Sequence, residues 1–312
     1  MMNQERILIA PLNWGLGHAS RCVPLIDRFL NEGHHLLIAG YGDAGEYLKK
    51  RYPQLEYIHF PGMEINYANK RWMKLKMLYQ FPKLIRSISK EHIQLKSIIE
   101  KHKITKVISD NRFGLYNKNV HCVFITHQVF IKTGLFEKLI HKINSSYIRR
   151  YNECWIPDVE TEPSLSGELS HGNTLPENCK YIGPLSRFSG VTLPPAEATL
   201  DVVIVISGPE PSRTRFEMQM IERFKNTGKK IALIRGTCAP STLIFPSEFV
   251  TVVDLAMDDE LLMLYAKSKH IICRSGYSTI MDLHALNLTA EYIATPGQPE
   301  QEYLAKLHSK HN

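Results

Sequence analysis

Four short loops hold the residues with which this sequence could do chemistry. Each loop follows an apolar run and opens a segment with helical periodicity, and the set is rich in glycine, hydroxyl and charged side chains. Glycine allows sharp turns that expose backbone amides, and the start of a helix attracts anions. The pattern predicts a site for a phosphate-containing ligand. The loops are residues 13–21, 207–213, 273–282 and 295–303.

The first loop combines two glycines with a titratable side chain. Gly15 and Gly17 precede His18, whose imidazole can exchange a proton near neutral pH. The loop lacks the GxGxxG spacing of a dinucleotide site, so it does not indicate NAD or FAD. An ordinary turn between a strand and a helix is the alternative. We interpret Gly15 and Gly17 as an acceptor or phosphate loop and His18 as the first candidate for a catalytic base.

The second loop places cations where a helix begins. Gly208 is followed by Ser212, which could cap the helix, and by Arg213 and Arg215 in the first turn. The helix dipole disfavours cations at this end. An anion bound at the same place would explain them, and a pair of solvated arginines is the alternative.

The third loop is the most informative, because hydroxyls and backbone amides coincide in it. Ser275, Ser278 and Thr279 surround the start of a helix, an arrangement that suits a phosphate. Asp282 lies one turn further, within reach of a ribose diol. The alternative for Asp282 is an exposed helical acid.

The fourth loop pairs an acid with an amide. Glu300 and Gln301 fall in the first turn of the last helix, where they could bind the hydroxyls of a sugar. Glutamate is also favoured at helix starts without any ligand, which is the alternative.

Two further candidates for the base follow strands of the first half. Asp110 ends one apolar run and His127 ends the next, and the carboxyl ends of parallel strands meet at one edge of a sheet. Polar residues that only shape their loops are the alternative. No Asp-x-Asp motif occurs, so we predict no metal site.

Composition limits the classes that need consideration. The 312 residues are 44% hydrophobic and 22% charged, as in an average globular protein. No apolar run approaches the length of about 20 residues that spans a membrane, and no signal peptide is evident. Six scattered cysteines without a CxxC indicate neither a zinc ribbon nor a disulfide framework. We therefore expect a cytoplasmic protein.

Apolar runs and helical stretches alternate twice along the chain, with a Pro-, Gly- and Ser-rich stretch at 157–195 between them. Such alternation predicts parallel α/β sheets. The expected fold is two Rossmann-like domains facing a cleft: residues 1–184, a linker at 185–200, and residues 201–312. Charge differs between the halves, since residues 1–155 carry 24 Lys and Arg against 12 Asp and Glu, whereas residues 156–312 carry 14 against 19.

The four loops together resemble GT-B glycosyltransferases, most closely the family that forms lipid II by transferring N-acetylglucosamine and its relatives (glycosyltransferase family 28-like). The family's Gly-rich loop ending in histidine matches the first loop here. Its Arg-Ser-Gly helix start matches Arg274, Ser275 and Gly276, its ribose-binding acid falls on Asp282, and its acid/amide pair for the donor sugar falls on Glu300 and Gln301.

This resemblance implies an enzyme that moves a hexose or N-acetylhexosamine from a nucleotide sugar, UDP-linked in the family, to an acceptor. It implies inversion at the anomeric carbon and neither a metal nor a cofactor. The donor residues would be Gly208, Ser212, Arg213, Arg274, Ser275, Gly276, Ser278, Thr279, Asp282, Glu300 and Gln301, with His18, Asp110 and His127 as catalytic candidates.

The sequence departs from the family pattern in two places. Pro209 and Pro211 interrupt the second glycine loop, and the chain ends eleven residues after Gln301, so we expect a shortened C-terminal domain. The alternatives are a sugar-nucleotide epimerase on the same fold and a catalytically idle nucleotide-binding protein.

The segment 70–106 holds 11 Lys and Arg but only two acids, interleaved with aromatic and aliphatic residues. This pattern indicates contact with an anionic membrane surface, which would place the enzyme at the inner face of the membrane with a lipid-linked acceptor. A core helix with a basic outer face is the alternative. Binding of nucleic acid is not expected, because no nucleic-acid motif accompanies the charge.

Overall fold

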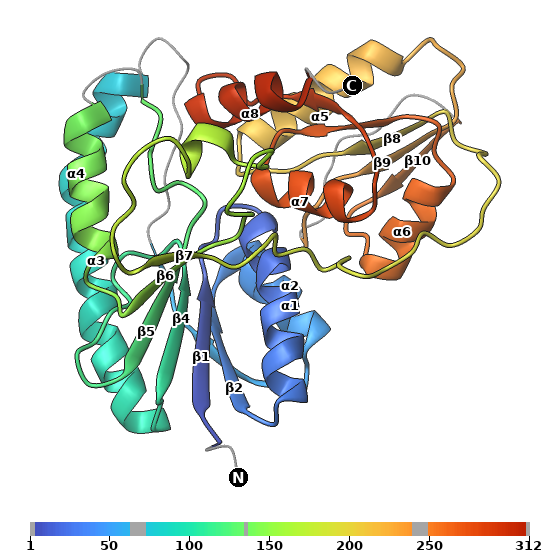
Figure 1. The fold of residues 1–312 in the computed structure, drawn as a ribbon. Coiled ribbons are helices and arrows are strands. Elements are labelled where there is room, and N and C mark those ends of the chain that lie inside the picture. The colour runs from blue at the N-terminus through green and yellow to red at the C-terminus, as the bar shows by residue number, and fades with distance from the viewer. Residues whose placement is uncertain (1–3, 63–72, 134–136, 239–248, 310–312) are drawn as a thin grey trace. The chain divides into compact units, whose positions relative to one another are not determined.

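The computed structural model describes residues 4–62, 73–133, 137–238 and 249–309, without the side chains of 73–81. The chain divides into two compact units (Figure 1). The first comprises the described residues up to Asn13 together with His18–Arg187. The second comprises Trp14–Gly17 together with the described residues from Phe188 onward.

The first unit is built on a seven-stranded parallel sheet with the order β3-β2-β1-β4-β5-β6-β7. Its central strands are short aliphatic runs buried on both faces, the composition that parallel sheets require. The strands are β1 (Arg6–Pro11), β2 (His35–Gly40), β3 (Glu56–His59), β4 (Lys106–Asp110), β5 (His121–Ile125), β6 (Glu153–Ile156) and β7 (Cys179–Tyr181).

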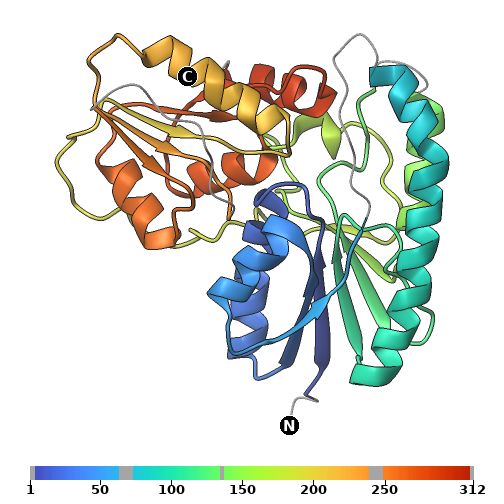
Figure 2. The same cartoon turned by 180° about the vertical axis from the view of Figure 1, so that it is seen from behind.

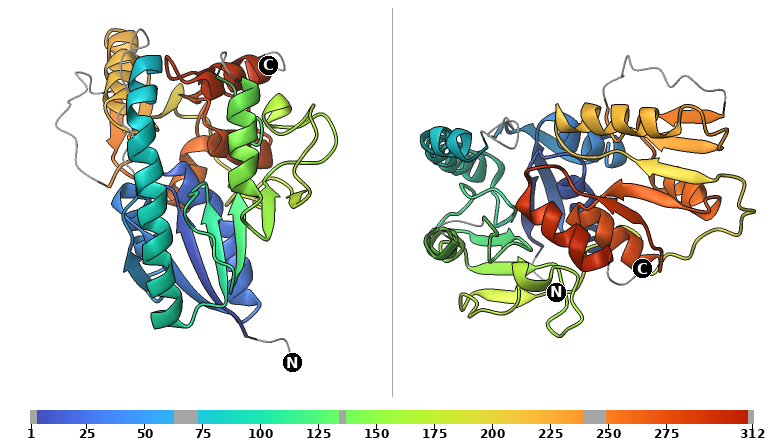
Figure 3. Two further views of the ribbon diagram at one scale, coloured as in Figure 1. Left: turned by 90° about the vertical axis from the view of Figure 1, so that its left-hand side faces the viewer. Right: turned by 90° about the horizontal axis from the view of Figure 1, so that it is seen from above.

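Helices cover both faces of this sheet. On one face, Leu95 of α3 (Met73–His102) and Ile148 of α4 (Glu137–Ile148) join Leu8 and Leu37 in a single core cluster. The other face is covered by α1 (Gly17–Asn31) and α2 (Gly42–Arg51). Figures 2 and 3 show these two layers from behind and from the side, with α3 and α4 running alongside each other.

The second unit has a five-stranded parallel sheet with the order β10-β9-β8-β11-β12. Phe216 of α5 packs on one face and Leu283 of α7 on the other, so two cores flank the sheet. The strands are β8 (Val202–Val205), β9 (Ile231–Ile234), β10 (Val250–Val253), β11 (Ile271–Arg274) and β12 (Glu291–Ile293). The helices are α5 (Ser212–Phe224), α6 (Asp258–Ala266), α7 (Tyr277–Ala285) and α8 (Pro299–Ser309).

The predicted fold class, two parallel α/β sheets, is confirmed. Within the Pro-, Gly- and Ser-rich stretch, the structure contains β7 and a 3-10 turn (Gly167–Leu169), and Phe188 is buried in the core of the second unit. Of the basic segment 70–106, residues 70–72 lie outside the described residues. Among the described helices, none is both long and apolar enough to cross a membrane.

Candidate active site

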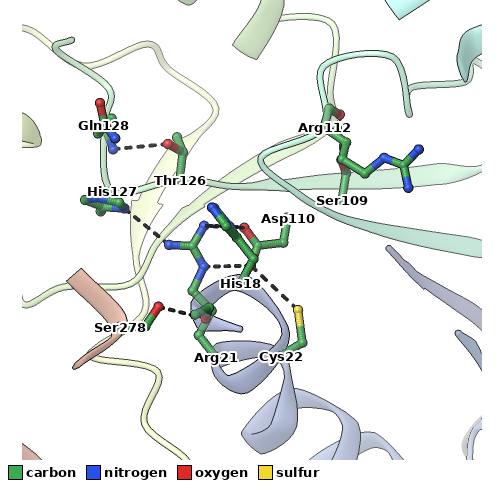
Figure 4. A network of polar contacts seen from close by, with 11 residues as sticks. His18, Arg21, Cys22, Ser109, Asp110, Arg112, Thr126, His127, Gln128 and Ser278 are labelled. Carbon is green, nitrogen blue, oxygen red and sulfur yellow. Dashed lines mark hydrogen bonds and ion pairs between the residues drawn. The ribbon is translucent and has the colours of Figure 1, made fainter. Parts of the chain in front are cut away.

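The three central strands of the first unit end level with one another. Pro11 of β1 is the register partner of Asp110 of β4, which is in turn the partner of Ile125 of β5. The chain then continues into α1 from β1 and into His127 from β5. This topology brings the three predicted catalytic residues, His18, Asp110 and His127, around one further side chain, Arg21 of α1 (Figure 4).

Asp110 is fully buried and is held by Arg21. The guanidinium Nε donates to Asp110 Oδ2 over 2.6 Å, and a second Arg21 nitrogen donates to Oδ1. Burial by itself raises the pKa of the Asp110 carboxyl, but Arg21 and then His18 outweigh burial and lower the pKa well below its usual range. Asp110 is therefore a permanent anion near neutral pH and cannot be the proton acceptor there.

His18 lies at the rim of this cluster. Its Nδ1 is 3.0 Å from Asp110 Oδ1, and its side chain is 13% exposed. An Arg21 nitrogen also lies 3.0 Å from Nδ1. Since Arg21 already donates to both oxygens of Asp110, we place the proton on Nδ1, where it is donated to the carboxylate. Nε2 then carries the lone pair, and it makes no hydrogen bond within the described part of the chain.

His127 differs from His18 in burial and in role. It is 4% exposed, and Arg21 Nη1 lies 3.2 Å from its Nδ1. Because a guanidinium can only donate, His127 Nδ1 must accept, which leaves the ring proton on Nε2. His127 therefore orients Arg21 rather than offering a free base.

Gly15 and Gly17 of the first loop belong to the second compact unit. Gly15 has a φ of +75°, a conformation that glycine adopts without strain. The Ser278 hydroxyl donates to the Gly17 carbonyl over 2.8 Å (Figure 4). Ser278 is thus a loop-fixing contact in this structure as well as a predicted donor residue.

The loop after β8 carries its own anion. Glu210 accepts from the Thr214 amide (3.2 Å) and hydroxyl (2.8 Å) and forms an ion pair with Arg213 (2.9 Å). Burial tends to raise the pKa of Glu210, but Thr214 and Arg213 lower it overall. Ser212 is the first residue of α5, with Pro211 as N-cap, so its side chain does not cap the helix. Glu210 occupies the place where Gly208, Ser212 and Arg213 were predicted to hold a donor phosphate.

The Arg274-Ser275 dipeptide ties three of the predicted loops together. Arg274 donates to the Ala294 carbonyl (2.8 Å), contacts the Ser212 carbonyl (3.5 Å) and stacks 3.8 Å above the Phe216 ring. The Ser275 hydroxyl donates to the Gln301 carbonyl over 2.7 Å. One end of β11 therefore fixes the loops that follow β8 and β12.

Helix α7 offers an open start. Gly276 is its N-cap, no acid lies in its first turn, and Ser278 and Thr279 are half-buried there. Asp282, one turn further, is 6% exposed, so it is not the exposed helical acid of the alternative reading.

The last loop is closed by its own side chains. Gln301 Oε1 accepts from the Thr295 amide (2.9 Å), and Glu302 Oε1 accepts from the Gly297 amide (3.1 Å). The amide nitrogen of Gln301 remains a donor that a sugar hydroxyl could use. Glu300 lies in the first turn of α8, as the sequence predicted.

Sequence reasoning missed the charged residues that support the base. Arg21 lies three residues after His18, one helical turn away, which was the available signal. Arg112 was also missed: it is 1% exposed, donates to Glu91 (2.9 Å) and to the Phe60 carbonyl (3.1 Å), and its own carbonyl accepts from Ser109 (2.6 Å). These contacts fix the turn that follows Asp110. Within the described residues, no cluster of three acid, histidine or cysteine side chains could hold a metal.

Comparison with known proteins gives this geometry a context. Residues 5–147 match the model of the family described as glycosyl transferase family 1. The sequence matches none of the curated proteins. Several solved structures cover nearly the whole chain. The chain has the GT-B fold.

Three of these structures illustrate the match. The spinosyn rhamnosyltransferase SpnG complexed with thymidine diphosphate has a TM-score of 0.59 and 12% identity, over 98% of this chain and 91% of that one. Arabidopsis thaliana UGT89C1 complexed with UDP-L-rhamnose has a TM-score of 0.58 and 10% identity, over 99% of this chain and 90% of that one. MurG of Acinetobacter baumannii has a TM-score of 0.51 and 11% identity, over 98% of this chain and 84% of that one. The predicted resemblance to GT-B glycosyltransferases is confirmed, and the prediction of a glycosyltransferase agrees with the family match.

Proposed function

We propose that this protein transfers a hexose or N-acetylhexosamine from a nucleotide sugar to an acceptor hydroxyl by direct displacement, with His18 as the general base. The observation that carries the proposal is the His18–Asp110 pair. The Nδ1 atom of His18 lies 3.0 Å from the buried carboxylate of Asp110, and the Nε2 atom of His18 is free to accept a proton. Asp110 would hold the ring and stabilise the imidazolium that forms, without taking the proton itself.

The second unit would bind the donor. The two phosphates of the donor suit the start of α7, where Ser278 and Thr279 accompany the backbone amides of the first turn and no side chain caps the helix, and Asp282 would bind the ribose. In direct displacement the acceptor oxygen attacks the anomeric carbon while the bond to the diphosphate breaks. Cationic and helix-start groups, rather than a metal ion, would stabilise the leaving diphosphate.

The nucleotide is proposed as UDP or dTDP. Two proteins of the same fold have structures with UDP-L-rhamnose and thymidine diphosphate, which supports this choice without separating the two bases. Binding of each nucleotide with EDTA present, measured by thermal stabilisation, tests both the base and the metal-free site. A ligand at about 100 times its dissociation constant adds about 2.7 kcal/mol of stability.

Product analysis tests the reaction itself. The protein is incubated with UDP- and dTDP-sugars, with and without an acceptor alcohol, and the His18→Ala variant serves as the comparison. A new glycoside that requires His18 supports transfer. An epimerised sugar nucleotide formed without acceptor indicates the epimerase. Nucleotide binding with no product from any donor indicates a binding protein and contradicts our proposal.

An anionic membrane surface is proposed as the place where the acceptor is met. On the described part of α3, the Ile93 side chain is 67% exposed among exposed lysines. On α4, Leu139 is 57% and Ile143 37% exposed, one turn apart and next to Lys138 and Lys142. Apolar side chains set among lysines suit an anionic lipid surface. Sedimentation with anionic and with neutral vesicles tests this, and equal failure to bind both contradicts it.

A further inference from the structure

Strands β6 and β7 are neighbours in the sheet of the first unit (Figure 1), and each carries a cysteine at the same level. Cys154 and Cys179 are register partners in this parallel pair, so their side chains leave the same face of the sheet. Cys154 belongs to the core cluster on that face, and Cys179 packs against the same cluster. Because many residues separate the two along the chain, no local motif in the sequence indicates the pair.

The two thiols are in contact. The Cys154 thiol donates a hydrogen bond to the sulfur of Cys179. Neighbouring strands lie about 4.8 Å apart, and a disulfide joins residues whose Cα atoms are about 4.4–6.8 Å apart. The spacing of the two strands therefore suits a disulfide. All six cysteines of the chain are free, so this pair is in the dithiol form in the structure.

Cys179 has the surroundings of a reactive thiol. The hydrogen bond from Cys154 lowers the pKa of the Cys179 thiol, burial raises it, and the positive charge of Arg149 lowers it, so that the net change is a decrease. Cys179 is half-buried on the edge strand β7, whereas Cys154 is fully buried. A partly exposed thiol with a lowered pKa and a second thiol in contact with it is typical of cysteines that react with peroxides.

Three other cysteines lack this combination. Burial raises the pKa of the thiol at Cys22, Cys122 and Cys273. The Cys22 thiol donates to Asp110 over 3.6 Å, and the Cys122 thiol donates to the Val120 carbonyl over 3.4 Å. These thiols are protonated near neutral pH and enclosed by the core, so an oxidant should select Cys179.

We propose that Cys154 and Cys179 form a modification site for hydroperoxides, with Cys179 as the attacking thiol and Cys154 as the resolving thiol. The Cys179 thiolate attacks one oxygen of hydrogen peroxide, the O–O bond breaks, and Cys179 becomes a sulfenic acid. The hydroxide that leaves takes up the proton that Cys179 had lost. The Cys154 sulfur then attacks the Cys179 sulfur, and the sulfenic hydroxyl group leaves as water with the Cys154 proton. In total, two thiols are oxidised to one disulfide and one peroxide is reduced to two water molecules.

The disulfide would close the segment between β6 and β7 into a covalent ring. This segment contains the loop that Asp158 holds by accepting from the amides of Leu165 (3.0 Å) and Ser166 (2.7 Å). The Leu169 carbonyl of the same loop accepts from the amide of Phe130, in the loop that follows β5, over 2.9 Å. A closed ring restricts the unfolded chain, so oxidation should stabilise the first unit. This inference does not depend on the proposed function.

The experiment compares the full-length wild type with three variants, Cys154→Ser, Cys179→Ser and Cys122→Ser. Cys122→Ser is the matched control, because it removes a fully buried thiol from the same sheet. Each folded protein is treated with a small excess of hydrogen peroxide, and the remaining thiols are then blocked in denaturant. Peptide mass spectrometry locates disulfides, and dimedone labels sulfenic acids. Melting temperatures are recorded before oxidation, after it, and after reduction with dithiothreitol.

If the inference holds, the wild type and Cys122→Ser each lose two thiols and contain a disulfide between Cys154 and Cys179. Both should melt about 5–10 °C higher after oxidation, since the ring restricts the unfolded chain. Dithiothreitol should reverse both changes. Cys154→Ser should stop at a sulfenic acid on Cys179, which dimedone labels, whereas Cys179→Ser should form neither a disulfide nor a sulfenic acid at Cys154.

Other results overturn the inference. If peroxide leaves Cys179 as a thiol, or oxidises Cys122 as fast as Cys179, the pair is not a selective site. If Cys179 is oxidised in the wild type but forms no disulfide with Cys154, then Cys154 is not a resolving thiol. The peptide map of the wild type decides these points without the variants, so a variant that fails to fold leaves the test intact.

Discussion

Each unit buries an arginine beside the carboxyl ends of its central strands, but the two arginines are treated in opposite ways. In the first unit, Arg21 is paired with Asp110, and together they orient two histidines. In the second unit, the partners of Arg274 among the described residues are carbonyl groups and an aromatic ring. In the first cluster, the positive charge of Arg21 and the negative charge of Asp110 balance each other. Such a balance is expected where permanently charged groups surround a residue that exchanges a proton. The charge of the second cluster has no acidic partner within the described residues.

The largest expected effect tests the complete site. His18→Ala removes the only proposed base, so turnover should fall by about 100- to 10,000-fold, the usual contribution of a positioned base. The dissociation constant of the nucleotide should change little, because His18 is not a donor residue in our proposal. Initial rates and nucleotide binding are measured on the same preparation.

The control for this loss is His121→Ala, a histidine of the same unit that is 39% exposed and paired with Glu153. It should keep wild-type turnover. If His18→Ala keeps its turnover as well, the base lies elsewhere and the proposed mechanism is wrong.

The next experiment removes the carboxylate partner of the buried arginine in the first unit. Asp110→Asn leaves Arg21 buried without its carboxylate, as Arg274 is now, and should destabilise the first unit by about 3–5 kcal/mol. The double variant Asp110→Asn/Arg21→Met removes both charges and should recover much of that stability while remaining inactive. Urea unfolding measures the stability. A double variant as unstable as the single one would show that the loss comes from packing and not from charge.

The strand ends that position the candidate catalytic residues could be predicted from the sequence. The apolar run Arg6–Pro11 of the sequence forms β1, because buried parallel strands are continuous aliphatic runs. Asp110 and His127 were placed at a common sheet edge by the same rule, and both lie around Arg21. The positions of these two residues could thus be predicted from the apolar runs that form the strands.

What the sequence did not show depends on long-range partners. Arg21 and Asp110 are 89 residues apart, and no local pattern links them. Helix α2 was missed because its segment, with two glycines and three consecutive basic residues, has a weak apolar stripe. Glu210 was passed over because its role comes from the turn that brings its carboxylate back onto Thr214. Side-chain pairing of this kind is decided by tertiary structure.

A smaller effect is expected at Glu210, whose carboxylate occupies the start of α5. If donor phosphates approach that position, the Glu210 carboxylate repels them and competes for Arg213. Glu210→Gln should then bind UDP or dTDP about three- to five-fold more tightly, a change of about 1 kcal/mol or less. Isothermal titration measures it.

Glu222→Gln, on the same helix and 72% exposed, is the control for a general change in charge. If both variants gain equally, the effect is long-range. If Glu210→Gln gains nothing, the diphosphate binds at the start of α7 alone, which sharpens the contrast between the two helix starts of the second unit.

The smallest effect concerns pH and contrasts Arg274 with Arg235, a buried arginine that follows β9 and is paired with Glu217 and Asp254. Burial lowers the pKa of Arg274 to about 10, so its charge is complete at pH 7 and about half lost at pH 10. Stabilisation by pyrophosphate that depends on this charge should therefore weaken by about two-fold in affinity as the pH rises from 7 to 10, and the Arg274→Gln variant should lack this change. Arg235, whose pKa is raised by two carboxylates, contributes no such step. Melting temperatures across this pH range, with and without pyrophosphate, give the comparison as a difference between wild type and variant, which cancels the titration of surface lysines. If the stabilisation of the wild type by pyrophosphate stays constant from pH 7 to pH 10, the bound anion does not interact with the charge of Arg274. The second unit would then have to balance that buried charge in some other way.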